Sequence, residues 1–106
     1  MKIVLDECLP IRLRLEFPEH ECVTVQYLQA KGTFDGPLLQ KIASAFDVLI
    51  TIDGNMQYQQ HFRKYPQFSV ISLSAENNSM KRLLPLVPAI RTALRTIQPG
   101  QHIRIP

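Results

Sequence analysis

The sequence predicts an α/β fold with a mostly parallel sheet, and three observations support this prediction. Short β-branched and apolar runs alternate along the chain with segments of helical period, the pattern of βα units. Runs such as Ile3-Val4-Leu5 do not alternate with polar residues, which is typical of strands covered on both faces. The 106 residues, 45% of them apolar, suit one compact domain over residues 1–106.

Four strands are expected, with a short fifth strand near the end of the chain. Each is a short run rich in β-branched or other apolar residues, and no repeat or low-complexity stretch interrupts the series. The expected strands are Lys2 to Leu5, Cys22 to Val25, Val48 to Ile52, Ser69 to Leu73 and His102 to Ile105.

Three helices are expected between these strands. Pro10 suits a first helical turn, so a short helix should run from there until Pro18 ends it. The second helix has Pro37 near its start and an apolar face made of Leu38, Leu39, Ile42, Ala43 and Phe46. The third precedes the stop at Pro99-Gly100 and has an apolar face made of Leu83, Val87, Ile90, Leu94 and Ile97, with a start blurred by Pro85 and Pro88.

Charge and cysteine content set weak limits on function. The formal charge of +3 and the pI near 9.1 are compatible with a polyanionic partner, but many proteins share them. The apolar run before Asp6 is too short for a signal-peptide core, and no apolar stretch approaches the ~20 residues of a membrane span. We therefore expect a soluble, cytoplasmic protein without a membrane partner. Cys8 and Cys22 lack C-x-x-C spacing, so reduced thiols are expected.

Two of the expected strands end directly on acidic residues. Asp6 and Glu7 follow the first strand, and Asp53 follows the strand Val48 to Ile52. Parallel strands have their carboxyl ends along one edge, so Asp6 and Asp53 converge if their strands are neighbours. Two close carboxylates repel and lose hydration, and a cation or a shared proton stabilises them. All-oxygen ligation is the preference of Mg²⁺ or Mn²⁺, which bind phosphate oxygens, so the pattern favours phosphate chemistry.

Each acid also has a structural interpretation. A carboxylate just after a strand is often solvated or caps the next helix, and solvation is the favoured interpretation of Glu7. Asp35 precedes Gly36-Pro37 at a helix start, where a cap and a metal ligand are equally open. Asp47 is expected to serve a turn into its strand.

Four blocks of sequence carry a resemblance to a known family. They are "DECLP" at Asp6 to Pro10, "DGPLL" at Asp35 to Leu39, "DVLITIDGNMQYQQ" at Asp47 to Gln60 and "LLPLVP" at Leu83 to Pro88. With these blocks the chain resembles the short PIN-like proteins, a branch of the PIN-domain superfamily described as predicted nucleases and potential toxin components of bacterial toxin–antitoxin operons. The resemblance implies a three-layer α/β/α sandwich with a mostly parallel sheet of four to five strands.

The resemblance also implies an activity. PIN nucleases use Mg²⁺ or Mn²⁺ to activate a water that attacks a phosphodiester, usually in RNA. Asp6 and Asp53 match two of the family's acids, and Asp35 is the candidate third, because related chains carry a Glu at the place of Pro37. The family often has a further acid near Asn55. These departures leave a second interpretation open: a PIN-like module that binds nucleic acid or a partner without hydrolysis.

Partners follow from the same resemblance and from basic and aromatic residues. Single-stranded RNA is the expected substrate; a small DNA-binding antitoxin protein and a second copy of the chain are further candidate partners. Aromatic side chains stack on unpaired bases while cations contact phosphates, which makes nucleic-acid ligands of Arg12, Tyr58, Arg63 and Lys64. The last three lie in "MQYQQHFRKY", which more commonly forms an ordinary amphipathic surface helix.

A receiver domain is a distant third interpretation. Receiver domains place an acidic pair after the first strand, an Asp after the third and a hydroxyl after the fourth. Asp6 and Glu7, Asp53, and Ser72 or Ser74 could take these places. The chain lacks a convincing lysine after a fifth strand, because "HIRIP" offers only an arginine.

Overall fold

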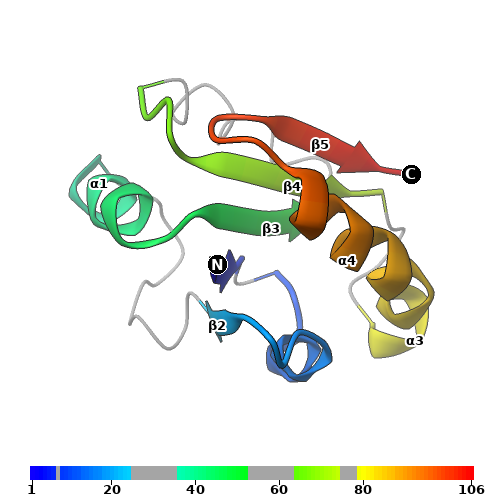
Figure 1. The fold of residues 1–106 in the computed structure, drawn as a ribbon. Helices are drawn as coiled ribbons and strands as arrows, with labels where there is room; N and C mark the ends of the chain where they lie inside the picture. The colour runs from blue at the N-terminus through cyan, green and yellow to red at the C-terminus, as the bar shows by residue number, and fades with distance from the viewer. Residues whose placement is uncertain (7, 25–35, 53–63, 75–78) are drawn as a thin grey trace.

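The computed structural model describes the chain except residues 7, 25–35, 53–63 and 75–78 and the side chains of residues 36–39. The described elements follow one another along the chain in the order β1 (Lys2–Leu5), η1 (Ile11–Glu16), β2 (Glu21–Thr24), α1 (Gly36–Ala45), β3 (Val48–Ile52), β4 (Ser69–Leu73), α3 (Met80–Leu83), η2 (Leu84–Leu86), α4 (Val87–Thr96) and β5 (His102–Ile105) (Figure 1).

The five strands form one parallel sheet in the order β2-β1-β3-β4-β5. The chain moves from β1 outward to β2 and then returns to the other side of β1 with β3, so the strand order reverses between β1 and β3. A ligand site in an open α/β sheet is expected beside such a reversal. The predicted parallel α/β architecture is confirmed.

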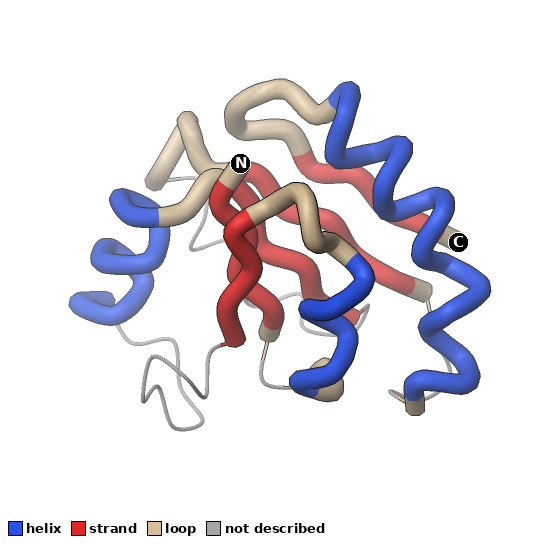
Figure 2. The backbone as a smooth tube through the Cα atoms, turned by 60° about the horizontal axis from the view of Figure 1, so that its bottom comes forward, coloured by secondary structure: helices blue, strands red, loops and turns tan. Residues whose placement is uncertain are grey.

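Helices cover both faces of the sheet (Figures 1 and 2). On one face, η1, α3 and α4 pack on side chains such as Ile3 and Leu5. On the other face, Ile42 of α1 packs on Val4 and Leu49. Successive strand residues therefore enter opposite cores, which explains why the strands lack polar alternation.

Helix η1 is a 3-10 helix. Pro10 stands just before it in an extended conformation, and its carbonyl accepts a hydrogen bond from the backbone N–H of Leu13 at 3.0 Å. This bond spans three residues, the spacing of a 3-10 helix. The short helix predicted here is present, and Leu13 is its buried contact with the sheet.

The predicted third helix is divided into α3, η2 and α4. Pro85 lies in the first turn of η2 and Pro88 in the first turn of α4. Proline lacks an N–H and is tolerated in a first turn, where that group has no partner within the helix. The predicted apolar face survives the division, since Leu83 and Ile90 are fully buried.

Helix α4 ends at Thr96, ahead of the stop predicted at Pro99-Gly100, and the glycine of that pair has a steric reason in the turn that leads to β5. Gly100 has a φ of 78°, and a Cβ there would lie 2.2 Å from the carbonyl oxygen of Pro66. Only glycine combines this conformation with such close backbone approach.

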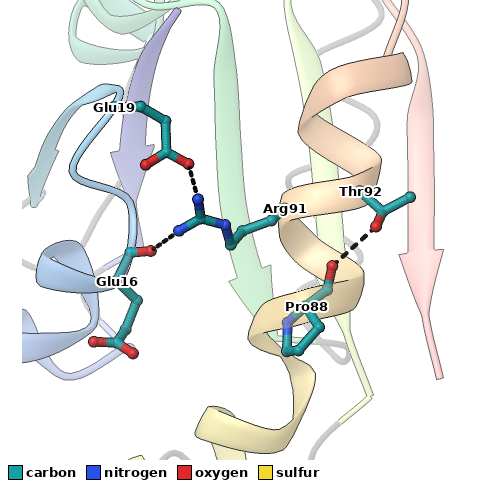
Figure 3. Close-up of polar contacts among 5 residues, drawn as sticks. All are labelled: Glu16, Glu19, Pro88, Arg91 and Thr92. Atoms are coloured by element: carbon teal, nitrogen blue, oxygen red, sulfur yellow. Dashed lines mark hydrogen bonds and ion pairs between the residues drawn. The ribbon is translucent and has the colours of Figure 1, made fainter.

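Arg91 of α4 joins the helix to the connection between η1 and β2 (Figure 3). Its Nη1 donates to the carbonyl oxygen of Glu16 at 3.0 Å, and its Nη2 lies 2.5 Å from Oε1 of Glu19. These contacts link α4 to the end of η1 and the residues after it, on the same face of the sheet. None of the described helices is long and apolar enough to cross a membrane.

Candidate functional site

Asp6 directly follows β1 at the carboxyl edge, beside the reversal of strand order. Its backbone N–H donates to the carbonyl oxygen of Ile50 at 3.0 Å, so pairing with β3 continues through this residue. The neighbouring pair in the register is Leu5 with Ile50. The side chain of Asp6 is buried, with 1% of its surface exposed. The two strands on which the acidic-edge prediction depends are therefore neighbours.

Thr51 fixes the carboxylate of Asp6. Its hydroxyl donates to Oδ2 of Asp6 at 2.5 Å, and the hydroxyl-bearing side chain is itself buried. A hydrogen bond to an ionised acceptor is shorter and about twice as strong as one between neutral groups. The carboxylate is thus held in one orientation at the end of the sheet.

The thiol of Cys8 lies close enough to the Asp6 carboxylate for its pKa to be affected by that charge. Burial and, next in size, the nearby Asp6 charge together raise the pKa of the Cys8 thiol from its ordinary value of 9.0 to about 11, against a hydrogen bond with the Ile52 backbone that lowers it. The thiol therefore keeps its proton at neutral pH. Burial likewise raises the pKa of Cys22 to about 11, and both cysteines are free thiols, as expected.

Helix η1 follows Asp6 closely in the chain. The carbonyl oxygen of Asp6 accepts from the backbone N–H of Leu9 at 3.0 Å, and η1 begins at Ile11. Arg12 is exposed and is the second residue of this helix, six positions after Asp6 in the chain. The proposed phosphate ligand Arg12 is thus placed close in the chain to the proposed site.

Lys64 lies at the opposite edge of the sheet. It precedes the turn in which the N–H of Phe68 donates to the carbonyl oxygen of Tyr65, and this turn leads into β4. There it lines a hollow of about 290 Å³ with Tyr65 and with Ala43 of α1. The turn leads into β4 at Ser69, whereas Thr51, the partner of Asp6, pairs with Ser72 three residues further along β4. These three residues of strand span about 10 Å. The structure does not bring Lys64 to Asp6.

The other predicted site residues lie outside the described part of the chain. These are the candidate metal ligands Asp35 and Asp53, the neighbouring residues Glu7 and Asn55, and the candidate RNA ligands Tyr58 and Arg63. Asp53 immediately follows Ile52, the last residue of β3, in the sequence. The prediction that Asp6, Asp35 and Asp53 meet therefore stays a prediction.

The donors at the described edge suit a hard cation. Carboxylate and hydroxyl oxygens are what Mg²⁺ and Mn²⁺ prefer, and Asp6 with Thr51 supplies both. Within the described residues, no group of three or more His, Cys, Asp or Glu side chains is arranged to hold a metal. The described edge thus contributes one carboxylate of the predicted set.

Polar side chains continue from Thr51 across the sheet. The register places Thr51 beside Ser72 and Ser72 beside Arg104. The hydroxyl of Ser72 lies 2.7 Å from Nε2 of His102, and Nη2 of Arg104 donates to the hydroxyl of Ser74 at 3.3 Å. Sequence reasoning named Ser72 and Ser74 only as candidate hydroxyls of a receiver domain; it missed the row as a whole and the Thr51 contact, although single hydroxyls inside apolar strands are a usable signal.

Asp47 has the structural role expected of it. Its Oδ2 accepts from the backbone N–H of Lys2 at 2.8 Å, and its own N–H donates to the Lys2 carbonyl oxygen at 2.8 Å. Asp47 thereby fixes the start of β3 beside the start of β1. It is an exposed acid at the amino edge of the sheet, opposite Asp6.

The fold and the edge together define a parallel α/β protein with a buried acid at the reversal of strand order. Comparisons with protein-family models, curated proteins and solved structures found no match.

Proposed function

We propose that the carboxyl edge around Asp6 binds Mg²⁺ or Mn²⁺ and hydrolyses phosphodiester bonds in single-stranded RNA, as a PIN-like nuclease of a toxin–antitoxin pair would. One observation carries the proposal: a fully buried aspartate stands beside the strand-order reversal, directly after a strand that neighbours the one that Asp53 follows. Ligands of open α/β sheets collect at such a place.

The burial of Asp6 supports a cation. A carboxylate taken out of water loses hydration worth several kcal/mol, and hydrogen bonds or an opposite charge must offset this loss. The Thr51 hydroxyl supplies part of the offset. A divalent cation supplies a larger Coulomb term at short distance, especially where water is excluded.

The residues have distinct roles in the proposed reaction. Asp6 and Asp53 hold the ion, with Asp35 as the third ligand. The bound ion would lower the pKa of a water and stabilise charge on the phosphate. Thr51 keeps the Asp6 carboxylate in one orientation, so little reorganisation is needed when substrate binds. Arg12, exposed and six residues after Asp6 in the chain, would contact a substrate phosphate.

A second function is favoured by the same contact. The Thr51 hydroxyl already bonds one oxygen of Asp6, and the Cys8 thiol lies beside that carboxylate. A buried aspartate with such neighbours is also suited to a purely structural role. In that case the protein is a PIN-like module that binds nucleic acid or a protein partner without hydrolysis.

RNA cleavage distinguishes the two functions. Purified protein is incubated with a mixed pool of single-stranded RNA in Mn²⁺, with EDTA and Asp6→Asn as the inactivating conditions. Asp47→Asn is the matched control, because it removes a carboxylate charge at the opposite edge while an amide oxygen there can still accept the Lys2 bond. The nuclease proposal expects cleavage by the wild type and by Asp47→Asn only.

Two results would count against hydrolysis. Cleavage that survives both EDTA and Asp6→Asn would identify a contaminating nuclease. Mn²⁺ binding by the wild type without any cleavage would favour the binding module.

A further inference from the structure

The outer surface of η1 is apolar and cationic at once. Residues three apart lie above one another in a 3-10 helix, so η1 has three columns of side chains. The column that begins with Leu13 faces inward, and Leu13 is fully buried. The other two columns pair Ile11 with Arg14 and Arg12 with Leu15, and all four side chains are exposed. Ile11 is 50% exposed and Leu15 is 61% exposed.

Residues 81–84 repeat this arrangement beside η1. Leu83 is fully buried, while Leu84 is 44% exposed three residues after the exposed Lys81. Arg82 is exposed as well. Helix α3 contacts η1, and both lie at the same end of the molecule (Figure 2). We call the outer surface of η1 and of residues 81–84 the η1–α3 face.

The η1–α3 face carries four cations and three large aliphatic side chains. In the part of the chain that the structure describes, the side-chain ion pair is that of Arg91 with Glu19, and it lies outside this face. Glu16 is the carboxylate of η1, and it belongs to the inward column with Leu13. Single exposed aliphatics are ordinary, but several of them on two contacting segments, within a strongly charged surface, are typical of interaction sites.

We propose that the η1–α3 face binds an acidic amphipathic segment of a protein partner. Leu15, Ile11 and Leu84 offer apolar contacts, and the surrounding cations complement Asp or Glu side chains of such a segment. Alternating apolar and acidic positions at helical spacing would meet both features together. This inference goes beyond the proposed reaction, since it needs neither a metal nor RNA.

Other occupants fit the face less well. RNA binding without sequence preference uses aromatic side chains for base stacking, and the apolar residues of this face are aliphatic. A symmetric contact between two copies would bring eight cations together, which is repulsive. Interfacial membrane helices present a larger apolar face, commonly with Trp or Phe.

Fluorescence anisotropy tests the proposal with a defined probe. The probe is a labelled synthetic helical peptide with Leu and Glu on adjoining faces. Its controls are a scrambled peptide of the same composition, a peptide with Lys in place of Glu, and a labelled oligouridylate. We expect the acidic amphipathic peptide to bind about tenfold or more tightly than either control peptide, with an affinity that falls as salt rises.

Two substitutions on the face should weaken binding of the probe. Leu15→Glu and Lys81→Glu are each expected to reduce affinity about tenfold. Arg95→Glu is the matched control, an exposed arginine of α4 away from the face, and should leave affinity unchanged. Circular dichroism checks that each variant is folded, and Leu15→Ser replaces Leu15→Glu if the latter is not.

Several outcomes would overturn the proposal. Equal affinity for the scrambled peptide, or equal weakening by Arg95→Glu, would show nonspecific attraction to a basic protein. Oligouridylate binding that Leu15→Glu abolishes would make RNA the occupant. A dimer in sedimentation that Leu15→Glu dissociates would make a second copy the occupant.

Discussion

Thr51→Val tests whether the hydrogen bond to Asp6 is a major element of the site. The substitution replaces a hydroxyl by a methyl group of similar size, so the packing of β3 is retained. What is removed is the donor to Oδ2 of Asp6, at 2.5 Å between two buried side chains. The perturbation therefore acts on one contact.

The expected loss follows from the charge and burial of that contact. A hydrogen bond to a charged group contributes about 1.5–3 kcal/mol to stability. The new buried methyl group recovers up to about 0.8 kcal/mol. We expect Thr51→Val to lower the free energy of unfolding by about 1–2 kcal/mol in the absence of added metal.

Urea denaturation at pH 7 measures this change. With a slope of roughly 1–3 kcal/mol/M, the midpoint should fall by about 0.3–2 M. Ser69→Ala is the control, because it removes a hydroxyl that donates to the neutral carbonyl oxygen of Gln98 at 2.8 Å. A neutral hydrogen bond contributes about 0.5–1.5 kcal/mol, so the control should lose less.

A double-mutant cycle with Asp6→Asn isolates the pair. The charged acceptor is absent in Asp6→Asn, so Thr51→Val should cost less in that background, with a coupling energy of about 1 kcal/mol. A Thr51→Val loss below about 0.5 kcal/mol, or effects that simply add, would refute the reasoning that Thr51 holds the carboxylate.

Three further predictions concern the fold, the thiols and the candidate third ligand. Arg91→Ala should lower the free energy of unfolding by about 1–2 kcal/mol, because it removes both the Glu16 and the Glu19 contacts. The control Arg95→Ala should change it by no more than about 0.5 kcal/mol, and equal losses in urea denaturation would contradict the prediction. The thiols of Cys8 and Cys22 have a pKa of about 11 in the folded protein and near 9.0 in the unfolded chain. The free energy of unfolding should therefore be constant below about pH 9 and fall by about 1–2 kcal/mol per thiol between pH 9 and 11. A loss in the wild type no larger than that in a Cys8→Ala, Cys22→Ala variant would contradict this prediction. Pro37→Glu should fold, since a carboxylate in the first turn of α1 is favoured by about 0.3–1 kcal/mol, and it should tighten Mn²⁺ binding. If the Mn²⁺ affinity of Pro37→Glu is unchanged while Asp35→Asn loses Mn²⁺ binding, Asp35 is the third ligand without help from position 37.

Much of the fold could be predicted because its local signals are strong. Short runs rich in β-branched and other apolar residues predicted the bounds of β1, β3, β4 and β5 as the structure has them. The strand β2 begins one residue earlier than predicted, at Glu21, whose N–H donates to the carbonyl oxygen of Met1 at 3.3 Å. Backbone pairing at the edge of a sheet includes a polar residue that an apolar pattern omits.

The positions of the described helices were predicted, but their helix types and subdivisions were not. Proline signals where a helix is interrupted, yet only the structure shows that Pro85 and Pro88 each begin a new segment. Whether a short segment such as η1 adopts a 3-10 or an α conformation depends on packing over one or two turns, which residue type alone does not determine.

The site was predictable only in part, because it depends on strand order. Asp6 stood out as an acid after an apolar strand. Its partner Thr51 is 45 residues away in the sequence and meets it only because β1 and β3 are neighbours in register. No local pattern specifies that register, so the hydrogen bond that orients the proposed ligand emerged from the structure alone.

Calorimetric titration with Mn²⁺ tests the central claim most directly, that Asp6 and Asp53 share one divalent cation at the carboxyl edge. The account predicts binding of one Mn²⁺ per chain by the wild type and by the amino-edge control Asp47→Asn, and loss of that binding in both Asp6→Asn and Asp53→Asn. Equal binding by all four proteins, or no binding by the wild type, would contradict it.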